Sequence, residues 1–101
     1  MLVHLDDFHQ MERNTLRGFA RVTLPELGLI VHDVAIHVRE AKAWASPPSR
    51  PMLGRDGTQL RDPAGKVQFA PTISFTSRGD QDAFSQAVLD AVRAARPEAL
   101  A

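Results

Sequence analysis

Two hydrophobic periods divide this chain, and together they limit the folds that are open to it. From residue 18 to residue 24 apolar and polar side chains alternate, with Ala20, Val22 and Leu24 on one side, as in a half-buried strand. From residue 84 to residue 95 the apolar residues recur at helical spacing instead. A change from strand period to helix period predicts the α+β class, with a sheet followed by a C-terminal helix.

Four segments have strand patterns: residues 18–24, 29–38, 42–46 and 67–75. The second is apolar on both faces and is expected at the centre of the sheet, with His32 inward and Asp33 outward. In the fourth, Val67 and Phe69 are expected inward, and Pro71 predicts an edge or a bulge. We expect a four-stranded antiparallel meander with one helix on its inward face.

The ends of the helix and of the domain also have sequence signals. Ser77 and Asp80 have the spacing of a capping box, and Pro97 stops the helical pattern. With 101 residues in all, one domain over residues 17–96 is expected. Residues 1–16 form a leader without clear alternation, in which a further strand through residues 1–5 stays open, and residues 97–101 form a tail.

Composition excludes several function classes. Twelve basic and twelve acidic residues balance to zero, so a polyanion would have to meet a local basic patch. The chain has no cysteine, which removes disulfides and thiolate sites. No nucleophile motif or histidine metal spacing is present, and no signal or transmembrane stretch. We expect a cytoplasmic protein that is not an enzyme, with no cofactor, no metal, no small-molecule substrate and no membrane partner.

The basic excess lies in the middle of the chain. Residues 39–66 hold six basic residues against three acidic ones, among most of the prolines and glycines, which predicts an exposed basic loop. Cations there would neutralise phosphates, and Trp44 would offer a stacking surface for a base. The predicted nucleic-acid-binding residues are Arg21, Arg39, Lys42, Trp44, Arg50, Arg55, Arg61 and Lys66. In the alternative, Trp44 packs in the core, and Arg55 and Arg61 are only solvated neighbours of Asp56 and Asp62 in a turn.

The outward face of the expected sheet mixes apolar and polar side chains. Its predicted members are Phe19, Arg21, Leu29, Val31, His37, Thr72 and Ser74. Such a face is too apolar for free contact with water, so a second copy of the chain or a ligand with charge and flat apolar surface is expected on it. A homodimer is the more common solution.

Four short motifs, taken in order, resemble one bacterial family. They are Ile30-Val31-His32-Asp33-Val34, the segment from Trp44 to Arg50, Ala70-Pro71-Thr72-Ile73 and Ala87-Val88-Leu89. This order and spacing is similar to the stage V sporulation protein G (SpoVG) family over residues 18–92. Pro47 and Ala70 depart from the pattern, which prefers Met and His, and Asp80 and Asp82 replace basic residues near the helix.

The resemblance implies a small β-rich fold with one helix, a dimer built through β-structure, and regulatory nucleic-acid binding. It places His32, Asp33, Ser49 and Arg50 on motif positions, with Arg50 as the phosphate contact. A plain role for the strand pair also remains open, with His32 in the core and Asp33 in a turn or an ion pair. The expected function is nucleic-acid binding of low sequence specificity, and the alternative is a protein-interaction module of mobile-element origin.

Overall fold

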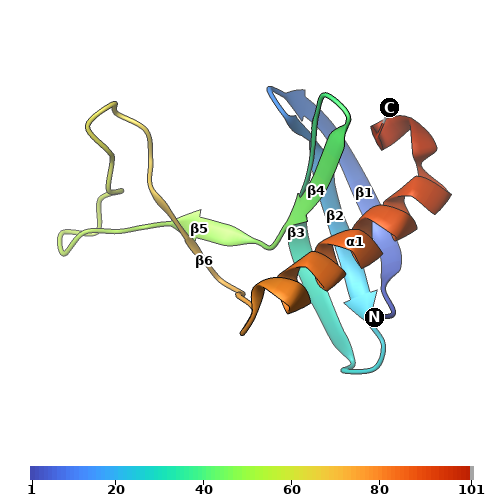
Figure 1. Cartoon of the computed structure of the whole chain (residues 1–101). Coiled ribbons are helices and arrows are strands. Elements are labelled where there is room, and N and C mark those ends of the chain that lie inside the picture. Colours follow the sequence, from blue (N-terminus) through green and yellow to red (C-terminus); the bar gives the residue numbers. More distant parts are fainter. Residues whose placement is uncertain (101) are drawn as a thin grey trace.

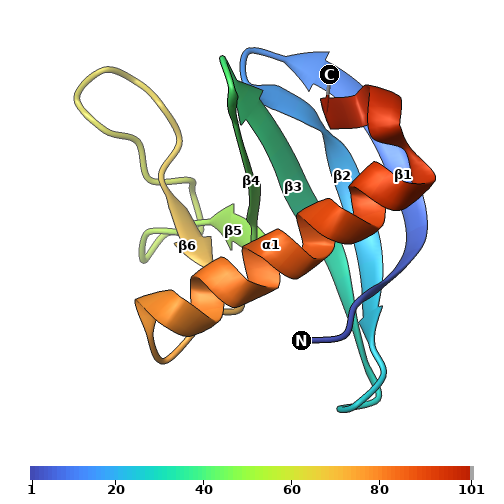
Figure 2. The same cartoon turned by 45° about the vertical axis from the view of Figure 1, so that its right-hand side comes forward.

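One antiparallel sheet with a helix across it forms the body of the protein. In a computed structural model that describes residues 1–100, the strands β1 (His4–Arg13), β2 (Leu16–Leu24), β3 (Leu29–Arg39) and β4 (Lys42–Ser46) pair in the order β1-β2-β3-β4. Helix α1 (Arg78–Ala95) crosses one face of this sheet (Figure 1, Figure 2). The predicted α+β class, with a four-stranded antiparallel meander and one C-terminal helix, is confirmed.

The membership of the sheet differs from the prediction at one position. The remaining strand of the sheet is β1, which comes from the expected leader. The prediction that residues 67–75 form a strand of this sheet is wrong. The alternation of β1 is hidden by a bulge, since Leu5 pairs with Val22 and Asp7 with Arg21, which leaves Asp6 without a partner. Strand β6 (Phe69–Pro71) instead pairs with β5 (Ser49–Pro51) in a separate two-stranded sheet.

The core lies between the sheet and the helix. Small and β-branched side chains from β2 and β3 pack against the apolar face of α1, where burial of one large side chain stabilises the fold by roughly 1.5–3 kcal/mol. The largest fully buried side chains are Phe84, Ile36, Val22, Val34, Val88 and Val92. The short 3-10 helix η1 (Pro97–Leu100) returns to this core and buries Ala99.

A second bulge reverses the predicted faces at the start of β3. Ala20 pairs with Val34 and Val22 with Val31, so that two residues of β3 lie opposite Arg21. Asp33, one of these two, has a left-handed backbone with φ 56°. Because of this extra residue, Val31 is buried, and His32 and Asp33 are both exposed on the other face, against the expectation of an inward His32.

Two serines fix the helix in place. Ser77 is the N-cap, where its side chain accepts a hydrogen bond of 3.1 Å from the Asp80 backbone N–H, as predicted. Ser85 Oγ accepts a hydrogen bond of 2.9 Å from the backbone N–H of Ala45, on the open edge of β4. No helix among residues 1–100 is long and apolar enough to cross a bilayer.

Residues 49–71 leave the body as a projecting arm (Figure 1). Beyond β5 and β6 the arm divides into a first tip, residues 53–59, and a second tip, residues 61–67, each closed by an antiparallel bridge. Backbone hydrogen bonds from Leu60 to Met52 and from Gln68 to Leu60 join the three segments where the arm divides. The expected wide hairpin connection is therefore a forked arm.

The two tips have the same backbone design. In the first, the N–H of Gly54 donates to Thr58 and that of Gly57 to Gly54, and the second repeats this pattern from Asp62 to Lys66. The fourth position of each turn is a glycine with positive φ, 82° at Gly57 and 86° at Gly65. This is the three-residue hairpin loop with a left-handed glycine, and a short ladder fixes each tip.

Candidate nucleic-acid interface

The sheet face opposite the helix, here called the outer face, carries three aromatic rings on three neighbouring strands. They are Phe19 on β2, His37 on β3 and Trp44 on β4, and we call them the aromatic strip. The His37 and Trp44 rings are stacked, with centroids 5.2 Å apart and planes within 10°. Trp44 is half-buried and does not belong to the core cluster. The alternative expectation of a core tryptophan is therefore wrong.

His37 is held in place by the neighbouring hairpin. Its Nδ1 lies 2.9 Å from the hydroxyl Oγ1 of Thr15. Partial burial lowers the pKa of His37 from its ordinary value of 6.5, which favours the neutral ring at neutral pH. The middle of the strip therefore offers flat, uncharged ring surface, with charge placed around it.

Cations surround the strip on the outer face. Arg39 and Lys42 face each other where β3 turns into β4, and Arg21 lies across the sheet on β2. Arg17, which the sequence analysis did not select, precedes Phe19 on the same face, and its guanidinium donates to the carbonyl of Asn14 at 2.9 Å. Among residues 1–100 none of these four cations forms an ion pair.

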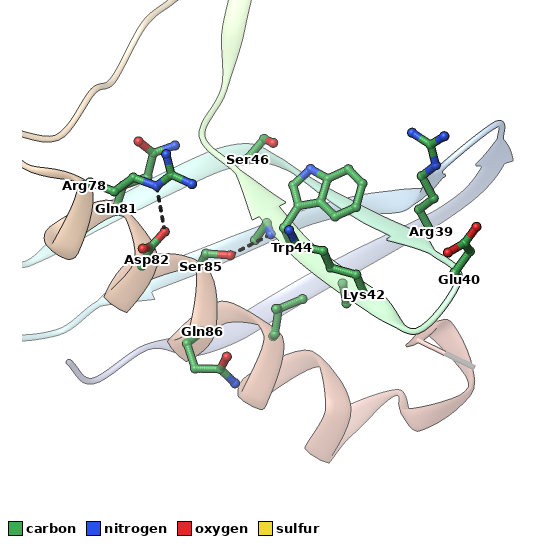
Figure 3. Close-up of a pocket in the computed structure, with 13 residues that line it drawn as sticks. Arg39, Glu40, Lys42, Trp44, Ser46, Arg78, Gln81, Asp82, Ser85 and Gln86 are labelled. Carbon is green, nitrogen blue, oxygen red and sulfur yellow. Dashed lines mark hydrogen bonds and ion pairs between the residues drawn. The ribbon is translucent and has the colours of Figure 1, made fainter.

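The strip continues into a hollow at the open edge of β4. Figure 3 shows Trp44, Lys42 and Arg39 along β4 and its turn with β3, and at the N-terminal end of α1 Arg78 and Asp82 form an exposed ion pair of 3.4 Å. The hollow has a volume of about 730 Å³. Its three cations exceed its two carboxylates, those of Glu40 and Asp82, by one charge.

The other four predicted residues lie on the arm. Arg50 is exposed on β5, Arg55 on the first tip, and Arg61 and Lys66 on the second. With Asp56 and Asp62 as the arm's only acids, four basic residues leave a balance of +2. Four of the eight predicted residues thus lie on the outer face and four on the arm. On the outer face, Arg39, Lys42 and Trp44 lie close together, and Arg21 lies apart from them.

The arm's two aspartates serve the turns and do not neutralise the arginines. Asp56 Oδ1 accepts hydrogen bonds from the backbone and the hydroxyl of Thr58, and these bonds lower the pKa of Asp56. Asp62 Oδ1 accepts from the N–H groups of Ala64 and Lys66. Each aspartate lies beside an arginine in a turn, as the alternative expected. No ion pair joins them in the described part of the chain.

A groove of about 550 Å³ lies between the outer face and the base of the arm. It is lined by Phe19, Asp33, Ala35, His37, Ser46, Pro47, Pro48, Ser49 and Phe69. Phe69, which was expected in the core, is 59% exposed instead. Its exposure is hidden in the sequence because residues 67–75 alternate like a sheet strand, and the nearby Pro71 is the only signal against that interpretation.

A smaller hollow on the outer face holds the motif residues His32 and Asp33. Arg21, Asp7 and His9 line it with them. No group of three ligating side chains within residues 1–100 is placed to hold a metal ion.

Comparisons with protein-family models, with curated protein sequences and with solved structures found no match to this chain. Its own residues therefore carry the functional argument.

Proposed function

We propose that this protein binds single-stranded nucleic acid, DNA or RNA, and reads the backbone more than the sequence. Bases would stack on the aromatic strip of the outer face, and the surrounding cations and the arm would hold the phosphates. One observation carries the proposal: an uncovered sheet face combines three aromatic rings with four cations that form no ion pair among residues 1–100.

The bases and the phosphates of a nucleic acid need different kinds of protein surface. Stacking of one base on an aromatic side chain contributes about 1–3 kcal/mol and tolerates every base, because each base has a π face. Unpaired bases are open to such stacking, whereas the bases of a duplex are stacked on one another. The strip therefore favours a single strand over a duplex.

Phosphate binding is the second part. Arg39 and Lys42 flank Trp44 within one hollow, so a base on the indole would keep its phosphates near two cations. The arm adds cations at both tips, on turns that the left-handed glycines hold in shape. Each phosphate neutralised in this way releases counterions, which makes binding sensitive to salt.

The resemblance to the SpoVG family supports the same proposal and adds a regulatory role in the bacterial cytoplasm. The absence of cysteine is consistent with a reducing compartment. Arg50, the motif position expected to contact phosphate, is exposed at the base of the arm beside the groove residue Ser49.

A specific observation favours protein contact as the second candidate. Leu53 is 56% exposed and Phe69 is 59% exposed, because the arm has no core of its own that could bury them. Apolar side chains on a projecting element are typical of a protein interface, and a second copy of the chain would make a homodimer. Sedimentation equilibrium between 1 and 100 µM tests this candidate, since a monomer across that range contradicts the homodimer.

The experiment for nucleic-acid binding is a fluorescence-anisotropy titration with 15-nucleotide single strands and a matched duplex. We expect tighter binding to single strands and an affinity that falls with salt by a logarithmic slope of about −0.7 per phosphate contact. The double variant Arg39→Gln/Lys42→Gln should bind more weakly. The double variant Arg93→Gln/Arg96→Gln, with the same change in charge on the helix side, should not. Binding that ignores salt, or equal losses in both variants, would contradict the proposal.

A further inference from the structure

The groove beside the arm combines a carboxylate with apolar ring surface. Asp33 lines it at one end and His37 at the other, four residues apart on β3 or about 13 Å at the usual rise of a strand. Between them Ala35 is too small to fill the space, and it pairs with Phe19 on one side and Ser46 on the other. The floor of the groove is therefore low at Ala35 and is bounded by the longer side chains of Asp33 and His37 at its two ends.

The walls of this groove suit a flat ring. Phe19 and His37 come from the sheet, and Phe69 faces the groove from the arm. Pro47 and Pro48 add apolar ring surface where the chain leaves β4. A volume of about 550 Å³ is within the usual range for small-ligand pockets, roughly 300–1,000 Å³. The groove therefore has the shape and surface of a site for an unstacked base.

Asp33 supplies the polar group that such a site needs for selection. Neither of its carboxylate oxygens accepts a hydrogen bond or forms an ion pair within residues 1–100. Its left-handed backbone belongs to the β3 bulge, which turns both His32 and Asp33 to the outer face. A carboxylate repels phosphate and accepts hydrogen bonds, so Asp33 suits a ligand group that donates them.

Among the common bases, guanine alone presents two adjacent donors on its Watson–Crick edge, the ring N1–H and the exocyclic amino group. The two oxygens of a carboxylate match this pair. Cytosine and adenine place a ring acceptor beside their amino group, and uracil and thymine place carbonyls beside their ring N–H. Unpaired bases in single strands are read on this edge.

From this geometry we infer that the groove between β3 and the arm binds one unpaired guanine, with Asp33 as the specificity-determining residue. The inference rests on the proposed function and adds a preferred base to it. Asp33 accepts from N1–H and the amino group, and Phe19 and Phe69 contact the ring. Phosphates on either side of the guanine remain with the cations of the outer face and the arm.

The test compares 15-nucleotide oligouridines that carry one central guanosine, inosine, adenosine or cytidine. Inosine keeps N1–H and lacks the amino group, so it removes one donor and leaves the rest of the base unchanged. We expect the guanosine strand to bind on the order of tenfold more tightly than the other three. Thymidine strands with one deoxyguanosine repeat the comparison for DNA and show whether the sugar matters.

Two variants locate the effect. Asp33→Asn keeps a residue that tolerates the left-handed backbone, and it should abolish the preference for guanosine over inosine. Asp7→Asn removes the same charge from the neighbouring hollow on the outer face and should leave that preference unchanged. Loss of a negative charge raises the affinity of both variants for every strand by a common factor, so the readout is the ratio between strands.

The outcomes separate the inference from the function on which it rests. If strands bind and the wild-type protein treats guanosine and inosine alike, the guanine site is wrong and the proposed function stands. The same holds if Asp33→Asn keeps the preference while its thermal melt matches the wild type. If no strand binds at 50 mM salt, both are overturned.

Discussion

The body and the arm of this protein carry the same kinds of residues but use them in opposite ways. In the body, Phe84 is buried to 2% exposure between the sheet and the helix, and aliphatic side chains surround it. In the arm, Phe69 is 59% exposed, and no residue of the arm belongs to the core cluster. The arm keeps its shape through backbone ladders, aspartate-bonded turns and two left-handed glycines.

This difference separates stability from binding. Packing between the sheet and the helix holds the fold, so the core side chains are committed to one another. The arm contributes little to the core, so its cations and the Phe69 ring remain available for a partner, as do the side chains on the outer face of the body. We expect substitutions in the core and substitutions on these open surfaces to affect different measurements, and five predictions test that separation.

The largest effect is expected from the same truncation made in each region. Phe84→Ala leaves a cavity in the core and should lower the free energy of unfolding by about 3–5 kcal/mol, measured by urea denaturation. Phe69→Ala should change it by less than about 0.5 kcal/mol, as for an ordinary surface position. Equal losses would mean that the arm packs against something in the folded protein, which would break the comparison.

The arm's cations should dominate the salt dependence of binding. Neutralising Arg55, Arg61 and Lys66 together to Gln should reduce the logarithmic salt slope by about 2, with an affinity loss of roughly ten- to a hundredfold at low salt. The melting temperature should not change. The double variant Arg93→Gln/Arg96→Gln on the helix side is the control, and an equal loss per charge removed there would assign binding to net charge alone.

The aromatic strip should contribute about as much as the arm but in a way that salt does not affect. Trp44→Ala removes the indole of the His37–Trp44 stack and should weaken single-strand binding by about 1–3 kcal/mol. The salt slope should stay as in the wild type. Trp44→Phe keeps a ring and should recover part of the affinity, whereas a similar loss in both variants would argue against stacking.

The left-handed glycines should matter locally. Gly57→Ala forces a side chain into positive φ, at a cost of about 1–2 kcal/mol. Because no core residue depends on the first tip, we expect faster proteolysis within residues 53–59 and an unchanged global melt. Gly18→Ala is the matched change in the body, where the new methyl group would meet the His9 carbonyl oxygen and the Phe8 ring at 2.5 Å and lower the global stability.

The smallest effect concerns pH. Burial lowers the pKa of His37, so the folded protein binds fewer protons at this ring than the unfolded chain does. This contribution to stability is complete above about pH 6.5 and is lost as the pH falls through the lowered pKa. The melting temperature should therefore fall less steeply from pH 8 to pH 5 for His37→Gln than for the wild type. Parallel curves would show that His37 is not the group that titrates.

The body could be predicted from the sequence because its signals are periodic. The alternation from Ala20 to Leu24, the extent of residues 42–46 and the Ser77 cap all reappear in the structure. The bulges could not be predicted, because an extra residue at Asp6 or Asp33 shifts the alternation by one and hides it. This shift concealed β1 in the leader and exchanged the expected faces of Val31 and His32.

The arm marks the other limit of the sequence analysis. Proline, glycine and basic residues predicted an exposed loop, and the cations are indeed exposed. Its forked backbone depends on hydrogen bonds among Met52, Leu60 and Gln68, which leave no pattern in side-chain type. Residues 67–75 alternate as a strand should, yet only Phe69, Ala70 and Pro71 form a strand, and it pairs with β5 rather than with the body.

The hydrogen bond from Ala45 to Ser85 also affects how molecules of this protein meet at high concentration. An unprotected edge strand exposes unpaired backbone groups, and strands of other molecules can pair with them and start a fibril. Here the serine hydroxyl occupies a donor that an incoming strand would need. Growth of a filament from β4 would therefore require the helix to detach first, and the same packing that holds the fold together protects the protein against self-assembly along that border.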